Sequence, residues 1–337
     1  MFKRILVPLD GSARAERALA VAARLAQASS GSIILLRVVS NTNELWIGEL
    51  PPRTQGDSPF APELTQAERY LAHVTVSPDL KAIPTETVTL VGSPAHVILS
   101  VASSYQADLI LLCSHGYAGM TRWIMGSVAE KVARHALLPV LVLREGGPVP
   151  AGPHPDASRP LRVLVPLDGS AYAKAALLPA ATLIAALAGP GQGAMHLLRV
   201  VPPPHEGKQD NRYAAALQKA RGYLQLTVEH LREGWVASPV HRLNLTITWS
   251  VAVETDVAEA LVRVAENGED AEGAGVFGGC DVIALASHGR SGLQRWAMGN
   301  VAERVLAATK LPLLIVRPPE MIDWKPVNRT QKVTTTP

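Results

Sequence analysis

The sequence predicts an α/β fold made of two tandem, doubly wound parallel-sheet domains. The length of 337 residues suits two domains of about 150 residues each. Apolar residues make up 47% of the chain, but Phe, Trp and Tyr together make up only 4%, so the cores must be mostly aliphatic. An aliphatic core favours helices packed on a sheet over a sandwich rich in aromatic residues.

An internal repeat is the second observation that predicts this fold. Three segments of the first half recur in the same order in the second half: Arg4–Ala13 as Arg162–Ala171, Leu36–Val39 as Leu198–Val201, and Ser114–Glu130 as Ser287–Glu303. The offset between the copies grows along the chain, which indicates insertions in the second copy. The candidate insertions are Gly189–Gly193 and Glu269–Gly279, both loop-like in composition.

The repeat sets the expected domain boundaries. We expect domains at residues 1–145 and 161–318, a Gly- and Pro-rich linker at 146–160, and a polar, disordered tail at 319–337. Long surface loops are predicted at Pro51–Pro62 and Pro202–Asn211.

Within the first copy, strand patterns alternate with helix patterns. The predicted strands are Ile5–Val7, Ile33–Val39, Thr85–Leu90, Leu109–Cys113 and Val140–Leu143. The helix predicted over Ala13–Ala28 places Leu19, Ala22, Ala23 and Ala26 on one face. Solid apolar runs are typical of parallel strands buried on both faces, whereas Thr85–Leu90 alternates, as a strand with one wet face at a sheet edge does. Alternating strands and helices predict a parallel sheet with right-handed crossovers.

The last strand of each copy raises the question of what covers it. Pro139–Leu143 and Pro312–Val316 are both apolar, and a bare apolar edge strand invites aggregation. We therefore expect the two edges to cover each other, so that the copies form an internal pseudo-twofold dimer.

Charge and cysteine content exclude several classes of protein. With 32 basic and 29 acidic residues, scattered along the chain, there is no electrostatic footprint for nucleic acid. Two cysteines, Cys113 and Cys280, cannot form a disulfide framework, which fits a reducing compartment. No signal peptide and no uninterrupted apolar run of membrane-spanning length is expected, so the predicted location is the cytoplasm.

The candidate site lies where the first and fourth strands end, because ligands of open α/β sheets bind at that edge. The first strand ends at Asp10, and the fourth at Cys113–Gly116. After nine intervening residues, Gly126-Ser127 opens a helix, for which Ser127 and Glu130 predict a capping box. Asn300 and Glu303 predict the same in the second copy. Glycines on both sides of a loop that returns to a helix N-terminus favour a seat for phosphate.

On these residues the chain resembles a tandem universal stress protein. ATP-binding members of that family carry Gly-x-x-Gly, nine residues, then Gly followed by Ser, Thr or Asn. The matching segments are Cys113–Gly116 with Gly126-Ser127, and Ala286–Gly289 with Gly299-Asn300. The resemblance implies five-stranded sheets in the order 3-2-1-4-5, an adenine nucleotide α-hydrolase-like fold, packed as an internal pseudo-dimer.

The resemblance also implies a nucleotide site in each copy. Asp10 and Asp168 would lie by the ribose, the backbone at Val38 and Val200 would pair with adenine, and the glycine loop would hold the phosphates. The implied binding residues are Pro8, Leu9, Asp10, Val38, Gly92, Cys113, Ser114, His115, Gly116, Arg122, Gly126, Ser127 and Val128 in copy one, and Pro166, Leu167, Asp168, Val200, Ala286, Ser287, His288, Gly289, Arg295, Gly299, Asn300 and Val301 in copy two. The implied cofactor is ATP, with AMP and ADP as alternatives, together with Mg²⁺.

Two departures from the family pattern stand out. The first glycine of the motif is Cys113 in one copy and Ala286 in the other. The turn after the third strand, Val91–Ala95, resembles the family, but its counterpart Glu254–Ala258 does not. The second site therefore matches less well than the first.

Other chemistries fit these residues less well. Ser114, His115 and Asp10 do not suggest a hydrolase triad, because adjacent residues place a hydroxyl poorly on an imidazole and no Gly-x-Ser-x-Gly elbow is present. No metal site is expected from protein side chains, since His115 and His288 lack spaced partners. Arg122 and Arg295 either reach phosphates or are solvated surface charges.

The predicted function is ATP binding in a stress or regulatory module. Neither copy has Gly-Lys-Ser, so a dedicated, fast ATPase is not expected, and slow hydrolysis stays open. The alternative is a nucleotide-free scaffold that acts through protein–protein contacts. An adenylating or phosphotransfer enzyme would need an acceptor pocket and bases that the sequence does not display. The expected partners are adenine nucleotide and, as an open alternative, a second copy of the chain, but neither nucleic acid nor membrane.

Overall fold

The computed structural model describes residues 1–40, 59–114, 126–152, 156, 159–190, 192–204, 211–288 and 298–318. In chain order, the first copy contains β1 (Arg4–Leu9), α1 (Ala13–Ser29), β2 (Ser32–Val39), α2 (Ala61–Thr75), β3 (Thr85–Val91), α3 (Pro94–Ser104), β4 (Leu109–Cys113), α4 (Ser127–His135) and β5 (Val140–Leu143).

The second copy repeats this order with additions. It contains β6 (Leu161–Pro166), α5 (Ala171–Lys174), α6 (Leu177–Ala188), β7 (Gly193–Val201), α7 (Asn211–Arg232), the 3-10 helix η1 (Ser238–Leu243), β8 (Thr246–Val253), α8 (Val257–Asn267), β9 (Glu269–Ala271), β10 (Gly275–Phe277), β11 (Val282–Ala286), α9 (Asn300–Ala308) and β12 (Leu313–Val316).

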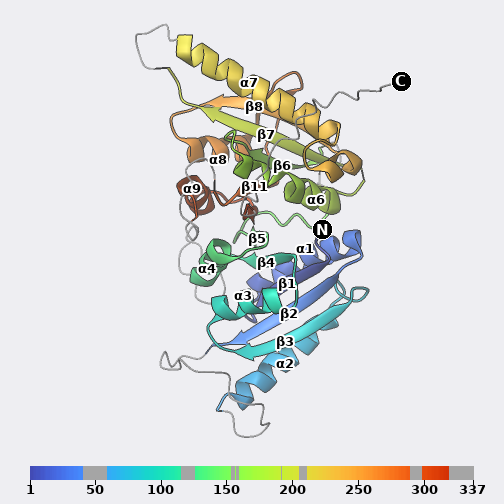
Figure 1. Cartoon of the computed structure of the whole chain (residues 1–337). Helices are drawn as coiled ribbons and strands as arrows, with labels where there is room; N and C mark the ends of the chain where they lie inside the picture. The colour runs from blue at the N-terminus through green and yellow to red at the C-terminus, as the bar shows by residue number, and fades with distance from the viewer. Residues whose placement is uncertain are drawn as a thin grey trace, which may run out of the picture.

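One ten-stranded sheet runs through both copies in the order β3-β2-β1-β4-β5-β12-β11-β6-β7-β8 (Figure 1). The first copy thus has the expected order 3-2-1-4-5, with parallel neighbours. The second copy has the same order once the hairpin β9–β10 is set aside. The predicted α/β fold with two doubly wound sheets is confirmed.

The two copies meet through their last strands, as the apolar sequence of these strands predicts. β5 and β12 pair antiparallel, with Leu141 opposite Leu314. Both leucines are completely buried. This pairing turns two potential edge strands into the centre of one sheet and confirms the internal pseudo-dimer.

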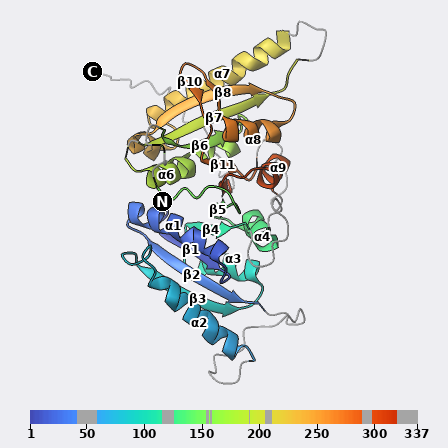
Figure 2. The same cartoon turned by 180° about the vertical axis from the view of Figure 1, so that it is seen from behind.

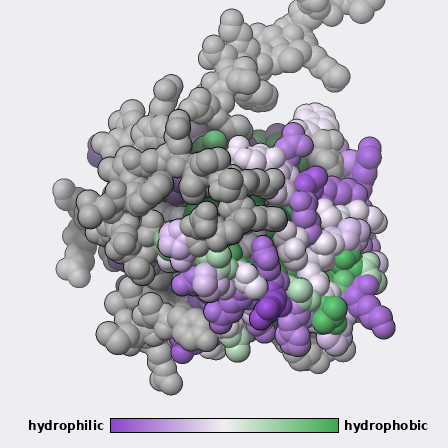
Figure 3. Space-filling view, turned by 90° about the horizontal axis from the view of Figure 1, so that it is seen from below, coloured by the Kyte–Doolittle hydropathy of each residue, from purple (hydrophilic) through white to green (hydrophobic). Residues whose placement is uncertain are grey.

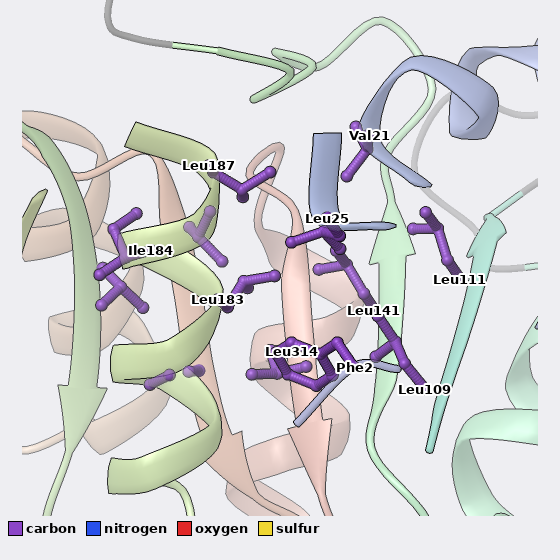
Figure 4. Packing of buried hydrophobic residues seen from close by; sticks show 14 of the residues in the cluster. Phe2, Val21, Leu25, Leu109, Leu111, Leu141, Leu183, Ile184, Leu187 and Leu314 are labelled. Atoms are coloured by element: carbon purple, nitrogen blue, oxygen red, sulfur yellow. The ribbon is translucent and has the colours of Figure 1, made fainter. Parts of the chain in front are cut away.

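Two helical layers cover the sheet, as the views from front and back show (Figures 1 and 2). α1, α2, α6 and α7 pack on one face, and α3, α4, α8 and α9 pack on the other. On the first face the core is continuous between the copies, because Leu25 of α1 lies beside Leu183 and Leu187 of α6 (Figure 4). The Arg24 guanidinium adds a hydrogen bond from Nε to the carbonyl of Leu187 at 3.3 Å.

The surface contrasts with this core. Seen from the α2 end of the molecule, the described hydrophobic residues lie in small groups among hydrophilic ones (Figure 3). Within the described residues one segment, Ala171–Ala188, is long and apolar enough for a membrane span, with a mean hydropathy of 1.6. However, 56% of it is buried inside the protein, and a buried core helix has the same composition.

The start of α1 shows why the sequence Asp-Gly-Ser-Ala precedes a helix. Ser12 caps α1 by accepting a hydrogen bond from the amide of Ala15 at 3.2 Å. The predicted inner face, Leu19, Ala22, Ala23 and Ala26, is buried. β3, the strand with the alternating pattern, lies at the sheet edge as expected.

Three loop predictions need correction. Glu269–Gly279 contains the antiparallel hairpin β9–β10, whose turn has positive φ angles at Gly273 and Gly275. The glycines that suggested a loop thus serve a tight turn. The hairpin lies beside the sheet edge, since the Glu272 amide donates to the carbonyl of Trp249. The other predicted loops end early, because Ala61 and Pro62 begin α2, where a proline fits the first turn, and Asn211 begins α7.

Candidate functional site

The candidate site residues follow neighbouring strands at the carboxyl edge of each half-sheet. β1 and β4 pair in parallel, so Asp10 and Ser114 emerge at the same edge where the winding direction reverses. β6 and β11 do the same for Asp168 and Ser287. Because β5 and β12 are antiparallel, β4 and β11 run in opposite directions, and the helices that follow them, α4 and α9, lie next to each other (Figure 1), joined by the ion pair of Arg134 with Glu303 at 2.9 Å.

The strand-one aspartates hold the turns that begin α1 and α5. Oδ1 of Asp10 accepts the amide hydrogen of Ser12 at 3.0 Å and also the Ser12 hydroxyl. Oδ1 of Asp168 accepts the Ser170 amide at 2.8 Å. Gly11 and Gly169, with φ of +82° and +88°, supply the left-handed conformation of each turn. Each aspartate therefore stabilises the turn after its strand. This turn lies at the carboxyl end of the strand, where the family resemblance places the ribose.

The residues before each aspartate end the strands. Leu9 and Leu167 are 3% and 2% exposed, so their side chains belong to the core and only their backbone faces the edge. Pro8 and Pro166 are half-buried.

One backbone hydrogen bond in each copy, the clamp, joins the end of the fourth strand to the glycine that precedes the next helix. The Gly126 amide donates to the carbonyl of Ser114 at 2.6 Å, and the Gly299 amide donates to that of Ser287 at 2.8 Å. A Cβ at Gly299 would lie 3.2 Å from the Ser287 carbonyl oxygen, so a side chain there would crowd the clamp. The predicted site residues His115, Gly116, Arg122, Gly289 and Arg295 lie outside the described residues.

The predicted capping boxes are wrong. The N-cap of α4 is Gly126 and that of α9 is Gly299, both extended, and neither helix start has a side-chain capping hydrogen bond. The Gly126 carbonyl accepts the amide of Glu130, and the Gly299 carbonyl accepts that of Glu303. Each helix therefore begins one residue earlier than it would if Ser127 or Asn300 were the N-cap of a capping box. The first-turn amides therefore stay free of side-chain caps.

The valines after these residues differ between the copies. Val128 packs partly against the core, whereas Val301 is 40% exposed. Neither valine brings a polar side chain to the helix start.

Cys113 and Ala286 stand where the family motif has its first glycine. The Cys113 thiol donates to the carbonyl of Arg14 at 2.9 Å, and burial raises the pKa of this thiol to about 11. Cys113 is therefore a thiol at neutral pH that ties β4 to α1. Ala286 is half-buried at the end of β11.

His288 has one satisfied ring nitrogen and one orphan. Its Nδ1 lies 3.0 Å from Oγ of Ser287, so in copy two adjacent residues do bring a hydroxyl to an imidazole. The expectation of poor placement was made for Ser114 and His115, and His115 lies outside the described residues. Its Nε2 is buried and has no partner among the described residues. Among the described residues no acid bonds to the histidine to complete a triad, and none form a group of three metal-ligating side chains.

The predicted adenine-side residues lie next to the turns after β3 and β8. Val38 and Val200 sit one residue before the ends of β2 and β7 and pack partly against the same core. The next carbonyl in copy one, that of Val39, accepts the Gly92 amide at 3.0 Å. Gly92 has φ of +153°, and a Cβ there would lie 2.9 Å from the Val97 side chain, so glycine is required.

The corresponding turn of copy two is acidic. Asp256 caps α8 by accepting the Glu259 amide at 3.1 Å, and it forms an ion pair with Arg304 of α9. The Arg304 hydrogen bond holds the pKa of Asp256 below its usual range. Glu254 pairs with Arg263 at 3.2 Å.

Sequence reasoning missed an arginine and a tyrosine in each copy. Arg37 donates to the Leu9 carbonyl at 3.3 Å, and Tyr70 donates its hydroxyl to Glu16 at 2.9 Å. Their counterparts are Arg199 and Tyr223. The signal was present, since the arginine is retained in both copies of the Leu-Arg-Val-Val segment.

With this geometry in place, the sequence pattern of the universal stress protein family matches residues 1–144 and 161–317. The chain belongs to the universal stress protein family. Among its relatives, a universal stress protein of Thermus aquaticus is 33% identical over 150 residues, and YxiE of Bacillus subtilis is 30% identical over 148 residues. Each alignment covers 43% of this chain and 100% of the relative.

A solved structure extends the likeness to both copies. The crystal structure of a universal stress protein from Archaeoglobus fulgidus superposes with a TM-score of 0.60 and 18% identity, covering 94% of this chain and 99% of that one. At this identity the likeness shows the fold alone. This universal stress protein thus shares its two-copy fold with a relative whose sequence has diverged widely.

Proposed function

We propose that this universal stress protein binds an adenine nucleotide, ATP with Mg²⁺, and acts as a regulatory module with little or slow hydrolysis. One observation carries the proposal: α4 and α9 both begin at a clamped glycine and have no side-chain cap. Free amides at a helix N-terminus, together with the helix dipole, favour a phosphate group.

The surroundings of the helix start support this proposal. Gly126 and Gly299 let the backbone approach a ligand closely, and the clamp to Ser114 and Ser287 fixes where the helix starts. The strand-one aspartates lie on the neighbouring strand, where the resemblance places the ribose. Phosphate and ribose contacts at adjacent strand ends would hold one nucleotide across the switch point of each half-sheet.

The regulatory role rests on mass action. A nucleotide that binds only the folded protein stabilises it, by about 2.7 kcal/mol when the free concentration is 100 times the Kd. The two helix starts lie on the same face of the sheet, where α4 and α9 are joined by the ion pair of Arg134 with Glu303 at 2.9 Å. We propose residues 1–145 and 161–318 as the two binding units, with 146–160 as linker. A cytoplasmic location fits the free state of Cys113 and Cys280.

The scaffold alternative has one observation in its favour. In copy two, carboxylates of Glu254 and Asp256 occupy the turn that in copy one is Gly92-Ser93. Negative charge beside a phosphate seat opposes nucleotide binding. Copy two can therefore serve as a structural partner to a single nucleotide-binding copy.

A melting experiment on the full chain tests the proposal. Saturating ATP with Mg²⁺ should raise the Tm by several degrees. Gly126→Val should remove most of this rise, because a side chain blocks backbone approach at the α4 start. The double variant Gly126→Val/Gly299→Val should remove any remaining part.

A matched substitution controls for loss of folding. Gly152→Val also adds a valine side chain, but a Cβ there meets no atom of the described residues within 4 Å, so the rise with ATP should persist. An unchanged Tm of the wild-type protein in saturating ATP contradicts the proposal. A rise as large as that of the wild type in both the Gly126→Val and the Gly299→Val protein would place the nucleotide elsewhere.

A further inference from the structure

Two cations lie against one aromatic ring at the carboxyl edge of the second copy. Nζ of Lys174, in α5, lies 5.2 Å from the ring centroid of Tyr223, and the guanidinium carbon of Arg199, in β7, lies 5.0 Å from it. Arg199 also reaches the turn at Gly169, where an added Cβ would meet its Nη1 at 2.9 Å. α5, β7 and α7 therefore bring these side chains together on the α6/α7 face of the sheet.

All three side chains have a donor without an acceptor in the part of the chain that the structure describes. Lys174 and Arg199 make no hydrogen bond or ion pair there; their contacts are those with the ring. The Tyr223 hydroxyl oxygen is buried and has no well-formed hydrogen bond with a described residue, and an interaction with the Thr227 side chain is the smallest of the influences on its pKa. The Thr227 hydroxyl donates to the backbone carbonyl of Tyr223 at 2.7 Å. Buried polar groups are nearly always satisfied in folded proteins, so the buried Tyr223 hydroxyl lacks an acceptor, while the half-buried Lys174 and Arg199 keep their donors open to an anion from solvent.

In the first copy, a side chain of the protein itself accepts the hydrogen bond of the equivalent tyrosine. Glu16, at the position of Lys174, accepts the hydroxyl of Tyr70, the counterpart of Tyr223. The acids and bases there are Asp10, Glu16 and Arg37, which give one net negative charge. In copy two they are Asp168, Lys174 and Arg199, which give one net positive charge. The replacement of Glu16 by Lys174 removes the acceptor and reverses the charge.

We propose that Lys174, Arg199 and the Tyr223 hydroxyl bind an oxyanion of the phosphate type. A guanidinium, an ammonium and a phenol are three donors on separate elements, and a phosphate group offers several oxygens to accept from them. Arginine in particular suits phosphate, because its planar fork donates more than one hydrogen bond. Asp168 lies close enough to act on the pKa of Tyr223, and it already accepts the amide of Ser170.

This site is separate from the phosphate seat of the proposed function. The seat lies at the start of α9, which packs on the opposite face of the sheet from α6 and α7. The phosphate at Lys174 comes either from a free phosphate or phosphate ester, or from the distal phosphate of a nucleotide that reaches over the edge. Binding of inorganic phosphate needs no ATP, so its test is independent of the nucleotide proposal.

Calorimetric titration of the full chain with inorganic phosphate tests the site at constant ionic strength. The wild-type protein should bind with saturation. Lys174→Glu should weaken binding at least about tenfold, because it restores the internal acceptor of copy one. Glu is accepted at this position in copy one, and an unchanged Tm confirms that the variant folds. Tyr223→Phe keeps the ring and should weaken binding by a smaller factor.

The reciprocal substitution provides a gain-of-function control. Glu16→Lys gives copy one the same three donors and should add a second phosphate-binding event. Equal phosphate affinity in wild-type and Lys174→Glu proteins would overturn the proposal, as would absence of saturable binding to the wild type.

Saturating ATP separates the two sources of the phosphate. If ATP abolishes phosphate binding in the wild type but not in Gly299→Val, the site takes the distal phosphate of the nucleotide. If phosphate binding persists in both proteins, the site takes a free phosphate or ester.

Discussion

The turns after β3 and β8 occupy the same place in the two copies but differ in charge. In copy one the turn is Gly92-Ser93-Pro94, and Ser93 makes no side-chain capping bond to α3. In copy two Asp256 caps α8 and pairs with Arg304 across to α9. The backbone framework is shared, whereas charge at the carboxyl edge is distributed differently: copy two has acids on the α8/α9 side and unpaired cations on the α6/α7 side. Sharing a fold does not make the two edges equivalent as binding sites.

The centre of the sheet is the most symmetric part of this comparison and carries the largest expected effect. Leu141→Ala and Leu314→Ala should each lower the free energy of unfolding by about 2–5 kcal/mol, because each removes a fully buried leucine. The two losses should be similar, since the residues face each other across the antiparallel pair. Urea unfolding measures them.

An exposed leucine provides the control. Leu137 is 77% exposed, so Leu137→Ala should change stability by less than about 0.5 kcal/mol. The double variant should deviate from additivity because both substitutions enlarge one cavity. Strongly unequal losses for Leu141→Ala and Leu314→Ala would show that the centre is not pseudo-symmetric in energy.

The interiors of the copies differ at one position of the second strand. Copy one has Ile34, whereas copy two has His196, a completely buried histidine. Its ring nitrogens lie 2.9 Å from the Thr248 hydroxyl and 2.8 Å from the Ser250 hydroxyl. Burial, and secondarily Arg162, lowers the pKa of His196 from 6.5 to about 3. This histidine is neutral in the folded protein.

Acid should therefore destabilise the protein through copy two. The neutral histidine's contribution is fully present above pH 6.5 and is lost as the pH falls from 6.5 towards 3, because the unfolded chain binds the proton first. The loss is about 1.4 kcal/mol per pH unit, or about 2 kcal/mol at pH 5. His196→Gln should remove this part of the pH dependence of urea unfolding. His73→Gln, at an exposed position of α2, should leave it unchanged. An identical pH profile for wild type and His196→Gln would contradict the assignment.

Features repeated locally in the sequence were predictable, and side-chain contacts between distant elements were not. The strands Leu109–Cys113 and Val140–Leu143 were predicted to the residue, because short, uninterrupted apolar runs between turns are typical of buried parallel strands. The pairing of β5 with β12 followed from two apolar edges in need of cover. The capping boxes failed because a Ser-x-x-Glu pattern does not tell whether the preceding glycine takes the cap position.

The proposed oxyanion site could not be predicted from the sequence, for a different reason. Lys174, Arg199 and Tyr223 come from three elements, and nothing in the order of residues says that their side chains meet. The hairpin β9–β10 was missed because its glycines, read as loop formers, mark its turn. Once the fold is known, the repeat shows that Lys174 in copy two stands at the position of Glu16 in copy one.

Exchanging Asp256 and Ser93 between the turns after β8 and β3 tests how far the two copies differ in nucleotide binding. The expected effect is smaller than those of the preceding predictions. In a Gly126→Val background, only the second site is expected to bind ATP. Asp256→Ser in that background should tighten ATP binding about threefold to tenfold, because it removes a negative charge and releases Arg304 from its ion pair. In a Gly299→Val background, Ser93→Asp should weaken ATP binding at the first site by a similar factor. Arg304 holds the pKa of Asp256 below its usual value of 3.8, so the carboxylate is charged throughout such titrations. The effects should shrink as salt rises, since they act through exposed charges. Unchanged ATP affinity at both sites would mean that these turns do not set the difference, which would then lie in Cys113 and Ala286.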